Sequence, residues 1–342
     1  MNSRDRFFAL LEGRSIDRIP LMPITMMFAA DQIGAKYMQY ATDYRVLVEG
    51  QICTAERFGF DLVSCISDPA REAGDLGAAV RFFDDQPPAF VESEALLADK
   101  SVLARLEVPA PCSGKRMFDR IQAAALFKER VGSDFVIEGW VEGPCALAAD
   151  LRGINTLMLD FYDDPAFVND LMAFVTEVAI AFARAQREAG VDLMGVGDAP
   201  SSLVGRAIFE QVIVPHHLKL VDALRAMGLK TRSHICGNTT RICEARAKLG
   251  YDILDFDSQV SLELVRKKIG LEPVILGNIP TVEVMALGSP SQVKATAAEC
   301  YRICGRNHII SAGCEVPRST PIENMNALRD FAYSLAGAGT AV

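Results

Sequence analysis

Short apolar runs alternate with longer segments of helical period along most of this 342-residue chain. This alternation is typical of βα units, because each buried strand of a parallel sheet is followed by an amphipathic helix. Eight runs fit the pattern, at residues 19–24, 61–66, 135–140, 192–197, 230–236, 251–257, 273–279 and 308–314. Eight parallel strands close a barrel, so we predict an α/β protein in which residues 1–342 form one (β/α)8 domain, a TIM barrel.

The predicted helices carry recognisable start and stop signals. Asp164-Pro165 begins a long amphipathic segment that Gly190 ends, and Ser289-Pro290 begins another. In the stretch 320–323 (TPIE), the Thr hydroxyl and the Glu carboxylate are spaced as a capping box. We therefore expect a final helix that starts there and closes the barrel.

One segment, residues 68–120, departs from the βα pattern. Gly, Pro and acidic residues surround a single short apolar run at 79–83. We predict an insertion after the second strand, which either covers the barrel mouth or makes a contact in a homo-oligomer. The sequence leaves these two roles and the oligomeric state open.

Composition narrows the class of protein. Half of the residues are hydrophobic and the formal net charge is −9, with no basic stripe, which argues for a large core and against nucleic acid as a partner. The nine cysteines show no paired spacing and the opening MNSRDRFFALLEG has no apolar signal core, so we expect a cytoplasmic protein without disulfides. No apolar run approaches the roughly 18 residues that a membrane span requires, so we expect no membrane contact.

Polar residues close the predicted strands. In a barrel of this type the active site forms at the carboxyl ends of the strands. The residues found there are Thr25, Asp68, Glu142, Asp198, His234 with Cys236, Asp257, Asn278 and Cys314. Thr25 and Asp68 are explained equally well as helix caps or turn formers.

The sharpest chemical signal is His234 and Cys236 on the fifth predicted strand, with Cys314 at the end of the eighth. Because side chains alternate along a strand, His234 and Cys236 point to the same side. Two thiolates and an imidazole suit zinc, and three protein ligands leave the fourth tetrahedral position open, as in catalytic sites. The spacing alone fits equally well two buried thiols with a helix-capping histidine.

Other cysteines and histidines point less clearly to chemistry. We expect a core role for Cys53, Cys65, Cys243, Cys300 and Cys304, which lie in apolar or helical segments. His216 and His217 follow a proline in the first turn of a predicted helix, where surface or capping roles are the more common. No dinucleotide fingerprint or phosphate-binding loop occurs, so no nucleotide is inferred.

With these residues in hand, the chain resembles a known group. RSHICGNT together with AGCEVPRSTPIENM is similar to the His-X-Cys…Cys zinc signature of corrinoid-linked methyltransferases in the uroporphyrinogen decarboxylase superfamily, of the methylcobalamin:coenzyme M and chloromethane methyltransferase type. The likeness runs from DRFFALLEGRSIDRIPLMPIT to the last helix. It implies a single barrel with catalytic Zn²⁺ on His234, Cys236 and Cys314, which moves a methyl group between a corrinoid and a thiol or a methoxy or methylthio substrate.

Two other functions compete with this one. The parent decarboxylases need no metal and grip an acidic porphyrinogen through arginines near the first strand, but the matching segment IPLMPITMMFAADQIG has no arginine. A barrel that stores or senses zinc without catalysis is the second alternative. A metal assay distinguishes the zinc methyltransferase from the metal-free decarboxylase. Turnover of methylcobalamin distinguishes it from a barrel that only stores or senses zinc.

Two acidic residues end the third and fourth predicted strands, near the expected metal. Glu142 and Asp198 are predicted catalytic residues that orient substrate, move protons or hydrogen-bond the zinc ligands, although a helix-capping role is an equal alternative for Asp198. The corrinoid (methylcobalamin) is expected on a separate partner protein, because the Asp-X-His-X-X-Gly motif of corrinoid modules is absent. The chain also lacks the roughly one hundred extra residues that an attached module of ordinary domain size would need.

Overall fold

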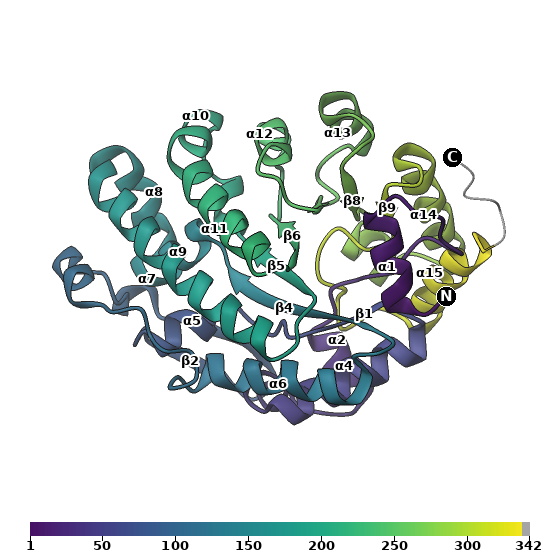
Figure 1. Ribbon diagram of the computed structural model, residues 1–342, viewed down its shortest axis with the longest axis horizontal. Coiled ribbons are helices and arrows are strands. Elements are labelled where there is room, and N and C mark those ends of the chain that lie inside the picture. The colour runs from purple at the N-terminus through teal and green to yellow at the C-terminus, as the bar shows by residue number, and fades with distance from the viewer. Residues whose placement is uncertain (337–342) are drawn as a thin grey trace.

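Seven parallel strands form one curved sheet in the computed structural model, which describes residues 1–336, in the order β1-β4-β5-β6-β7-β8-β9 (Figure 1). The strands are β1 (Leu62–Ser64), β4 (Val136–Glu142), β5 (Leu193–Gly197), β6 (Lys230–His234), β7 (Ile253–Asp255), β8 (Val274–Leu276) and β9 (His308–Ile309). Each overlaps a run predicted from the sequence. The α/β class and the parallel sheet are therefore confirmed.

The first predicted strand, at residues 19–24, is not a regular strand. It makes an isolated parallel bridge between Leu21 and Ile310, and the Leu21 carbonyl accepts a 2.9 Å hydrogen bond from Asp61 N. Pro20 and Pro23 have no N–H to donate, so the segment cannot sustain a full ladder. It is an extended connection between β9 and β1, where the prediction placed an eighth strand.

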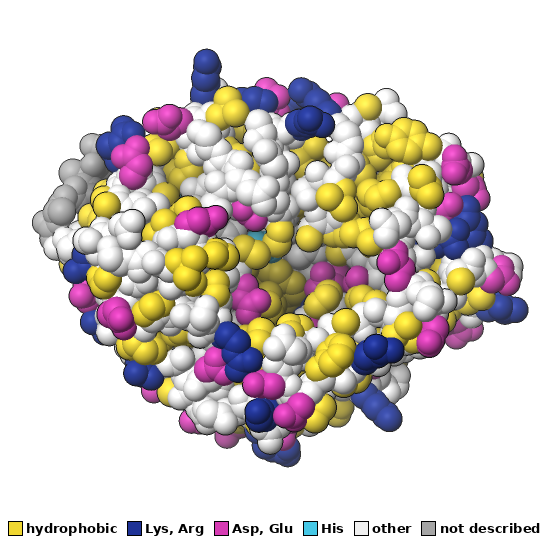
Figure 2. Space-filling model, turned by 180° about the vertical axis from the view of Figure 1, so that it is seen from behind, with side chains coloured by type: hydrophobic (Ala, Val, Ile, Leu, Met, Phe, Trp, Pro, Cys, Tyr) yellow, Lys and Arg dark blue, Asp and Glu magenta, His cyan; other side chains and the backbone are white. Residues whose placement is uncertain are grey.

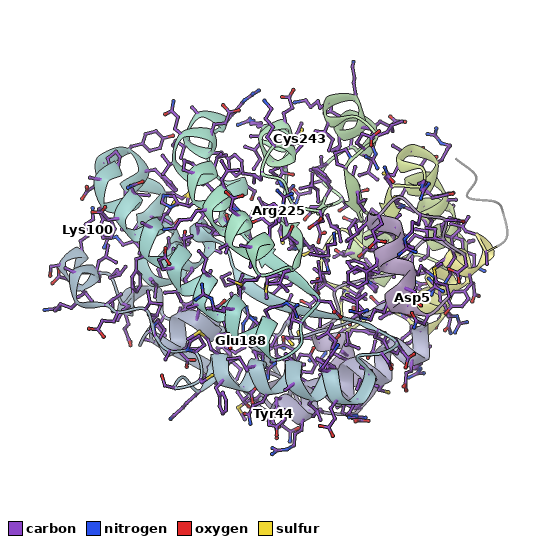
Figure 3. The ribbon with its side chains drawn as sticks, viewed as in Figure 1. Asp5, Tyr44, Lys100, Glu188, Arg225 and Cys243 are labelled. Atoms are coloured by element: carbon purple, nitrogen blue, oxygen red, sulfur yellow. The ribbon has the colours of Figure 1, made fainter. Side chains whose placement is uncertain are left out.

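Helices surround the sheet on its outer side (Figure 1), and side chains fill the space between the two layers (Figure 3). Every residue of the seven strands except Lys230 at the start of β6 is buried, because helices cover one face and side chains fill the interior of the curve. The helices are α1 (Ser3–Leu11), α2 (Met27–Gln32), α3 (Tyr37–Thr42), α4 (Tyr44–Phe58), α5 (Ala70–Asp75), α6 (Arg116–Val131), α7 (Pro144–Arg152), α8 (Ile154–Asp163), α9 (Pro165–Glu188), α10 (Arg206–Ile208), α11 (Val214–Ala226), α12 (Cys243–Ala247), α13 (Leu262–Ile269), α14 (Pro290–Cys304) and α15 (Ile322–Ser334).

The segment predicted as an insertion connects β1 to α6 and carries structure of its own. It contains α5, an antiparallel hairpin of β2 (Val80–Phe83) and β3 (Gln86–Phe90), and 3₁₀ turns at Glu92–Glu94 and Lys100–Arg105. Lys100, at the edge of the molecule in Figure 3, lies 2.7 Å from Asp160 and 2.9 Å from Asp164. These ion pairs tie the segment to the helices that follow β4. Its role in an oligomer stays a prediction.

Two of the three predicted helix starts are confirmed. The Asp164 side chain accepts a 3.2 Å hydrogen bond from Phe167 N at the start of α9. Ser289 and Gln292 form a capping box at the start of α14. Both helices therefore begin with a satisfied amide and a proline in their first turn.

The predicted capping box at residues 320–323 is wrong. The first amides of α15 donate to the carbonyl of Pro321, which makes that residue the cap, while Thr320 N donates to Pro317 O in a turn. The helix thus begins one residue too late for Thr320 to cap it, and among residues 1–336 the buried Thr320 hydroxyl has no hydrogen-bond partner.

Helix α9 corrects the expectation that no segment is apolar enough to cross a membrane. By length and composition alone it qualifies, with a mean hydropathy of 1.6 over its most apolar window. In the fold, 61% of that window is buried, and the helix packs against α7, α8, α11 and β4. Its apolar character is therefore that of a core helix.

Candidate metal centre

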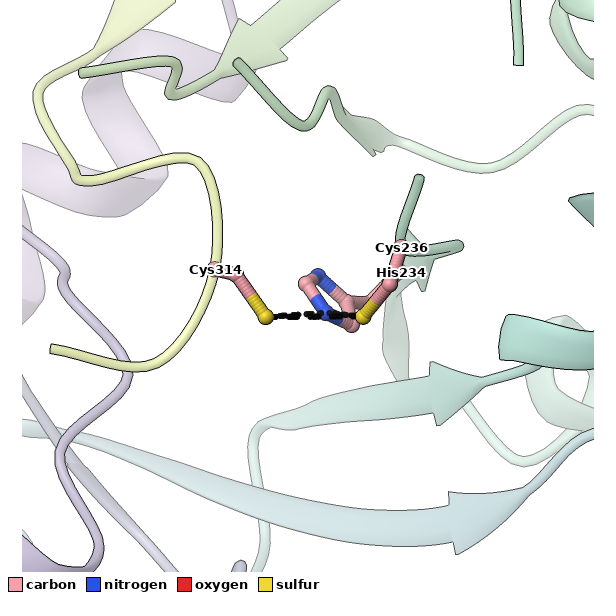
Figure 4. A group of neighbouring side chains, drawn as sticks. All are labelled: His234, Cys236 and Cys314. Atoms are coloured by element: carbon pink, nitrogen blue, oxygen red, sulfur yellow. Dashed lines mark hydrogen bonds between the residues drawn. The ribbon is translucent and has the colours of Figure 1, made fainter. Parts of the chain in front are cut away.

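The three predicted ligands converge at the carboxyl edge of the sheet (Figure 4). His234 is the last residue of β6, Cys236 lies two positions beyond it, and Cys314 lies in the loop after β9. His234 Nε2 is 3.0 Å from Cys236 Sγ and 3.8 Å from Cys314 Sγ, and the two sulfur atoms are 3.4 Å apart. One imidazole nitrogen and two sulfurs from segments far apart in the sequence therefore form a compact triangle.

The dimensions of this triangle fit a tetrahedral zinc ion. Zinc lies about 2.3 Å from a thiolate and about 2.0 Å from an imidazole nitrogen, so tetrahedral ligand atoms are separated by roughly 3.5 to 3.8 Å. The three observed separations of 3.0, 3.4 and 3.8 Å lie within about 0.5 Å of these values, so small side-chain adjustments would admit the ion. A nitrogen and two soft sulfur donors are also the ligand types that zinc prefers.

A buried ion-pair network holds the imidazole in place. His234 Nδ1 lies 2.9 Å from Asp255 Oδ2 on β7, and the same carboxylate accepts hydrogen bonds from Arg232. Arg232 in turn lies 2.8 Å from Glu138 on β4. Because Nδ1–H donates to Asp255, Nε2 is the nitrogen that faces the two sulfurs, and it would offer its electron pair to a metal once it gives up its proton.

The protein groups alone already favour a thiolate at this place. The hydrogen bond with Cys236 lowers the pKa of Cys314 to about 4, although burial opposes this shift. Burial lowers the pKa of His234, but the hydrogen bonds with Asp255 and Cys314 more than compensate and raise it to about 9. The cluster thus contains an ionised sulfur beside a positively polarised ring, which is the electrostatic setting of a metal-binding cysteine.

The cluster forms one wall of a cavity of about 310 Å³. The cavity is lined by Ile24, Met26, Ile66, Asp68, Pro69, Trp140, Glu142, Ala146, Asp150, Gly197, Asp198, Ala199, Pro200, His234, Cys236, Cys314 and Glu315. Figure 2 shows the central hollow, where a histidine and acidic side chains lie among hydrophobic ones. A small molecule in this space would have the cluster on one side and apolar side chains on the other.

Glu142 lines this cavity, as the sequence analysis expected of a residue at the end of its strand. It is 7% exposed, and its Oε1 lies 2.9 Å from Arg71 on α5. Burial raises the pKa of Glu142 to about 8, because the nearby Arg71 offsets only part of the cost of ionising a buried carboxyl, and Glu72 adds to it. A carboxyl group with this pKa can accept or donate a proton near neutrality.

Asp198 also borders the cavity, but the protein already engages its carboxylate. Oδ1 accepts a 2.6 Å hydrogen bond from Ala146 N in the first turn of α7, and Oδ2 accepts a 2.5 Å bond from Ser201. His217 Nε2 lies 2.8 Å from the same Oδ2, and His217 Nδ1 lies 2.8 Å from the Tyr251 hydroxyl. Asp198 therefore anchors three structural segments, including a helix other than the one that follows its own strand.

The expected surface or capping role of His216 and His217 is wrong. Both side chains are buried, and His217 is fully enclosed between Asp198 and Tyr251. The proline before them marks the start of α11 correctly, but the face of that helix which carries His217 packs inward. A pattern of helix starts cannot reveal this, because it does not say which residue of the first turn faces the sheet.

The remaining strand-end residues divide into two groups. Asp68 lines the cavity and pairs with Arg116 at 2.6 Å. Thr25, Asp257 and Asn278 do not line it. Asn278 donates to the carbonyl of Asp257, and Asp257 accepts from Gly237 N, so these two hold the loops after β6, β7 and β8 together.

Sequence reasoning missed several residues of the site. Asp255 ends β7 two positions before the residue that was singled out there, and Asp150 and Glu315 line the cavity from α7 and from the loop after β9. A signal for Asp255 was available, since a carboxylate two positions before a strand-end Asp257 shares its side of the strand. Nothing in the local sequence marks Asp150 as different from other helical acids.

The five cysteines for which a core role was predicted are buried or half-buried. Cys65, Cys243, Cys300 and Cys304 are buried, and Cys53 is half-buried; Cys145, for which no role was predicted, is buried as well. Burial raises the pKa of Cys65 to about 12 and that of Cys304 to about 11. These two thiols are therefore protonated side chains of the core.

Comparison with known proteins gives consistent matches over nearly the whole chain. The family model described as uroporphyrinogen decarboxylase (URO-D) matches residues 2–335. Methylcobamide:CoM methyltransferase MtaA of Methanosarcina barkeri is 27% identical over 353 residues, which cover 97% of this chain and 98% of the relative. Methylcobamide:CoM methyltransferase MtbA of Methanosarcina mazei is 24% identical over 336 residues, covering 96% and 97%.

A solved structure has the same fold. It is described as a methyltransferase from Methanosarcina mazei, is 22% identical, and superposes with a TM-score of 0.89 over 98% of this chain and 99% of that chain. The arrangement of strands, outer helices and connecting loops is therefore one that a known protein shares from end to end.

Proposed function

The chain belongs to the uroporphyrinogen decarboxylase family, and from its similarity to the methylcobamide:CoM methyltransferases we propose that it is a zinc-dependent methyltransferase of a corrinoid system. It transfers a methyl group between a corrinoid on a separate protein and a thiol, or a methoxy or methylthio compound. The observation that carries the proposal is the cluster of His234, Cys236 and Cys314, whose ligand atoms lie within 4.8 Å of one another on the wall of the cavity. A cavity beside three ligands leaves room for a substrate as the fourth.

The residues around the cluster have separate tasks in this proposal. Zinc held by the three side chains would keep a coordinated thiol ionised near neutrality, or withdraw electrons from a coordinated ether or thioether atom. Asp255 orients His234 for binding. Ile24, Ile66 and Trp140 form an apolar wall that excludes water from the reacting atoms.

Bonds, electrons and protons are all accounted for in both directions of the methyl transfer. In thiol methylation, a sulfur lone pair forms the S–C bond, the Co–C bond breaks with both electrons left on cobalt, and the thiol proton passes to a base. In demethylation, the methyl group would pass to the corrinoid of the partner protein, the C–O or C–S bond would break with its electrons left on oxygen or sulfur, and that atom would take up a proton. We assign this proton to the carboxyl of Glu142, which lines the cavity and has a pKa of about 8.

The metal site and the cavity together favour this function over the two alternatives. A metal-free decarboxylase has no use for a histidine oriented by Asp255 toward two cysteine sulfurs. A zinc store has no use for a cavity of about 310 Å³ at the open side of the ligands. A catalytic zinc needs both.

Metal analysis and a single optical assay test the proposal. The purified protein is expected to hold about one zinc per chain, and Ala at position 234, 236 or 314 is expected to remove most of it. Cys243→Ser, which changes a buried cysteine on α12, is the matched control and is expected to keep the metal. The zinc-loaded protein with an accepted thiol is expected to convert methylcobalamin to cobalamin with its colour change.

Two results would contradict the proposal. Full zinc retention in Cys314→Ala would show that the metal is bound elsewhere. A zinc-loaded protein that leaves methylcobalamin unchanged with every thiol and ether tried, and also fails with a methylated corrinoid protein from the same operon, would point to the zinc store. We expect the chain to purify without a corrinoid spectrum, because the cofactor belongs to the partner.

A further inference from the structure

The cavity beside His234, Cys236 and Cys314, here called the metal cluster, is lined by several acidic side chains. Five of its lining residues are acidic and none is Lys or Arg: Asp68, Glu142, Asp150, Asp198 and Glu315. A second cavity of about 260 Å³ shares Asp150 and Pro200 with the first and adds Glu92 and Glu94, again with no Lys or Arg in its lining. The Asp and Glu side chains of the two cavities are therefore not matched by any Lys or Arg in the same linings.

The cations that balance these acids lie behind them. Arg71 contacts Glu142 and is fully buried on α5, and Arg116 contacts Asp68 from α6. Neither arginine lines either cavity. Away from the cluster of His234, Cys236 and Cys314, a ligand in this space would therefore meet the carboxylate and not the guanidinium of each pair, so an anionic group there has no Lys or Arg to contact.

Among the acids that line the cavity, Asp150 has a buried oxygen without a partner. Its Oδ2 atom has no hydrogen-bond partner among residues 1–336, and the nearby Arg71 offsets only part of the effect of burial on its pKa. Asp150 shares one face of α7 with Ala146 and Ala149. Ala146 lines the first cavity, Ala149 lines the second, and Asp150 lines both. A buried acceptor without a partner is destabilising, and a donor group on a ligand would relieve this cost.

We propose that Asp150 is the substrate-recognition residue of this site, and that the small methyl donor or acceptor is an uncharged or positively charged molecule. Its sulfur or oxygen lies at the metal cluster, its carbon skeleton lies against Ile24, Ile66 and Trp140, and a hydroxyl or ammonium group at its other end donates to Asp150. The inference rests on the proposed function and deepens it. It separates this chain from a transferase for an anionic thiol, although the relatives named above act on CoM.

The electrostatics of the cavity exclude an anion in either protonation state of the acids. Burial raises the pKa of Asp150 well above its ordinary range, which favours the neutral carboxyl, a group that can still form hydrogen bonds. Beside an ammonium group the carboxylate form is favoured, which adds a charge-assisted hydrogen bond. Beside a sulfonate or carboxylate, neither form supplies a positive charge.

Three thiols of equal length test the proposal, since they differ only at the end away from sulfur: cysteamine, 2-mercaptoethanol and 2-mercaptoethanesulfonate. Dissociation constants are measured by calorimetry on the zinc-loaded protein, and zinc-edge absorption reports whether the sulfur joins the metal. We expect cysteamine to bind tightest, 2-mercaptoethanol to follow, and the sulfonate to bind at least about tenfold more weakly than cysteamine, the ratio given by one lost charge-assisted hydrogen bond.

The variant Asp150→Asn identifies the residue responsible. It keeps the shape of the side chain and is expected to weaken cysteamine by about tenfold, with less than about a threefold change for 2-mercaptoethanol. Asp163→Asn, at an exposed position on α8, changes the net charge by the same amount and is expected to leave all three dissociation constants unchanged. Changes in kcat/KM for methylcobalamin demethylation are expected to follow the same order.

The proposal is overturned if the sulfonate binds as tightly as cysteamine, if Asp150→Asn leaves the order unchanged, or if none of the three thiols binds. Failure of the proposed function has a different signature. It appears as missing zinc or as no methyl transfer with any partner, whereas the inference stands or falls on the order of the three constants.

Discussion

The orientation of His234 in the metal cluster depends on a neighbouring residue, Asp255, that is not itself a proposed metal ligand. His234 can present Nε2 to Cys236 and Cys314 because Asp255 accepts the proton of Nδ1. Asp255 keeps its charge in a buried place because Arg232 donates to it through more than one nitrogen. The ligand geometry is thus set by an ion pair located between β6 and β7.

The first prediction at this scale concerns Asp255. Asp255→Asn keeps the volume but removes the charge that fixes the imidazole, so zinc affinity is expected to fall by about 10- to 100-fold. A competition titration with a chromophoric chelator measures it. Asp252→Asn, just before the same strand β7, is the control, because Asp252 bonds Thr231 and not a ligand. Equal zinc affinity in the wild type and in Asp255→Asn would contradict the prediction.

Residue-level prediction from the sequence succeeded where strand geometry carried the information. His234 and Cys236 could be paired because the strand period is two, and Cys314 could join them because all strands end at one edge. His217 and Asp150 could not be found, since their importance comes from contacts with Asp198 and with the cavities, made across helices whose rotation the sequence does not show.

At the scale of elements, the strand pattern is reliable because burial on both faces leaves a continuous apolar run. Strand β5 (LMGVG) follows it closely, and Gly195 and Gly197 leave room for the Trp140 ring, since a Cβ would lie within about 3 Å of it. Strand β6 (KTRSH) is polar although four of its five residues are buried, because Arg232 and His234 pair with Asp255. Residues 19–24 carry an equally apolar run but fail as a strand because two prolines interrupt the hydrogen bonds. Apolar character predicts where a segment lies, whereas backbone donors decide whether it forms a ladder.

Helix starts provide a comparison of two kinds of cap. The first turn of α7 is capped by Asp198 from the loop after β5, a distant and buried residue, whereas α14 is capped by its own exposed Ser289. Asp198→Ala is expected to lower the free energy of unfolding by about 2 to 4 kcal/mol, because it removes a cap and takes away the partner of His217 Nε2 and of the Ser201 hydroxyl. Ser289→Ala is expected to cost about 1 kcal/mol.

Denaturant unfolding of the two variants measures this difference. The zinc content of each is determined in parallel, since Asp198 does not contact a ligand and its loss is expected to leave the metal in place. Equal destabilisation by the two substitutions would show that the contacts of Asp198 with His217 and Ser201 add nothing to stability, and would return Asp198 to the catalytic role predicted from the sequence.

On the scale of the whole molecule, the curved sheet has two chemically different edges. The carboxyl edge holds the metal cluster, both acidic cavities and the segment after β1, while the amino edge carries short connections such as the one from α13 to β8. Methyl transfer requires cobalt, the methyl carbon and the attacking atom to be nearly in line at contact distance. A corrinoid protein can satisfy this requirement only by covering the carboxyl edge.

Two leucines with the same exposure test where the corrinoid protein docks. Leu203 follows β5 at the carboxyl edge, Leu271 precedes β8 at the amino edge, and each is 62% exposed. Leu203→Asp places a charge in the proposed contact and is expected to slow transfer from the methylated corrinoid protein by roughly tenfold or more, as a desolvated charge at an interface costs over about 1.4 kcal/mol. Leu271→Asp is expected to have no effect on that rate.

Neither substitution is expected to change the slow reaction with free methylcobalamin, because that molecule needs only the open cavity. A loss of partner-dependent transfer in Leu271→Asp, with Leu203→Asp unaffected, would place the docking surface on the amino edge and contradict the geometry argued from the metal cluster.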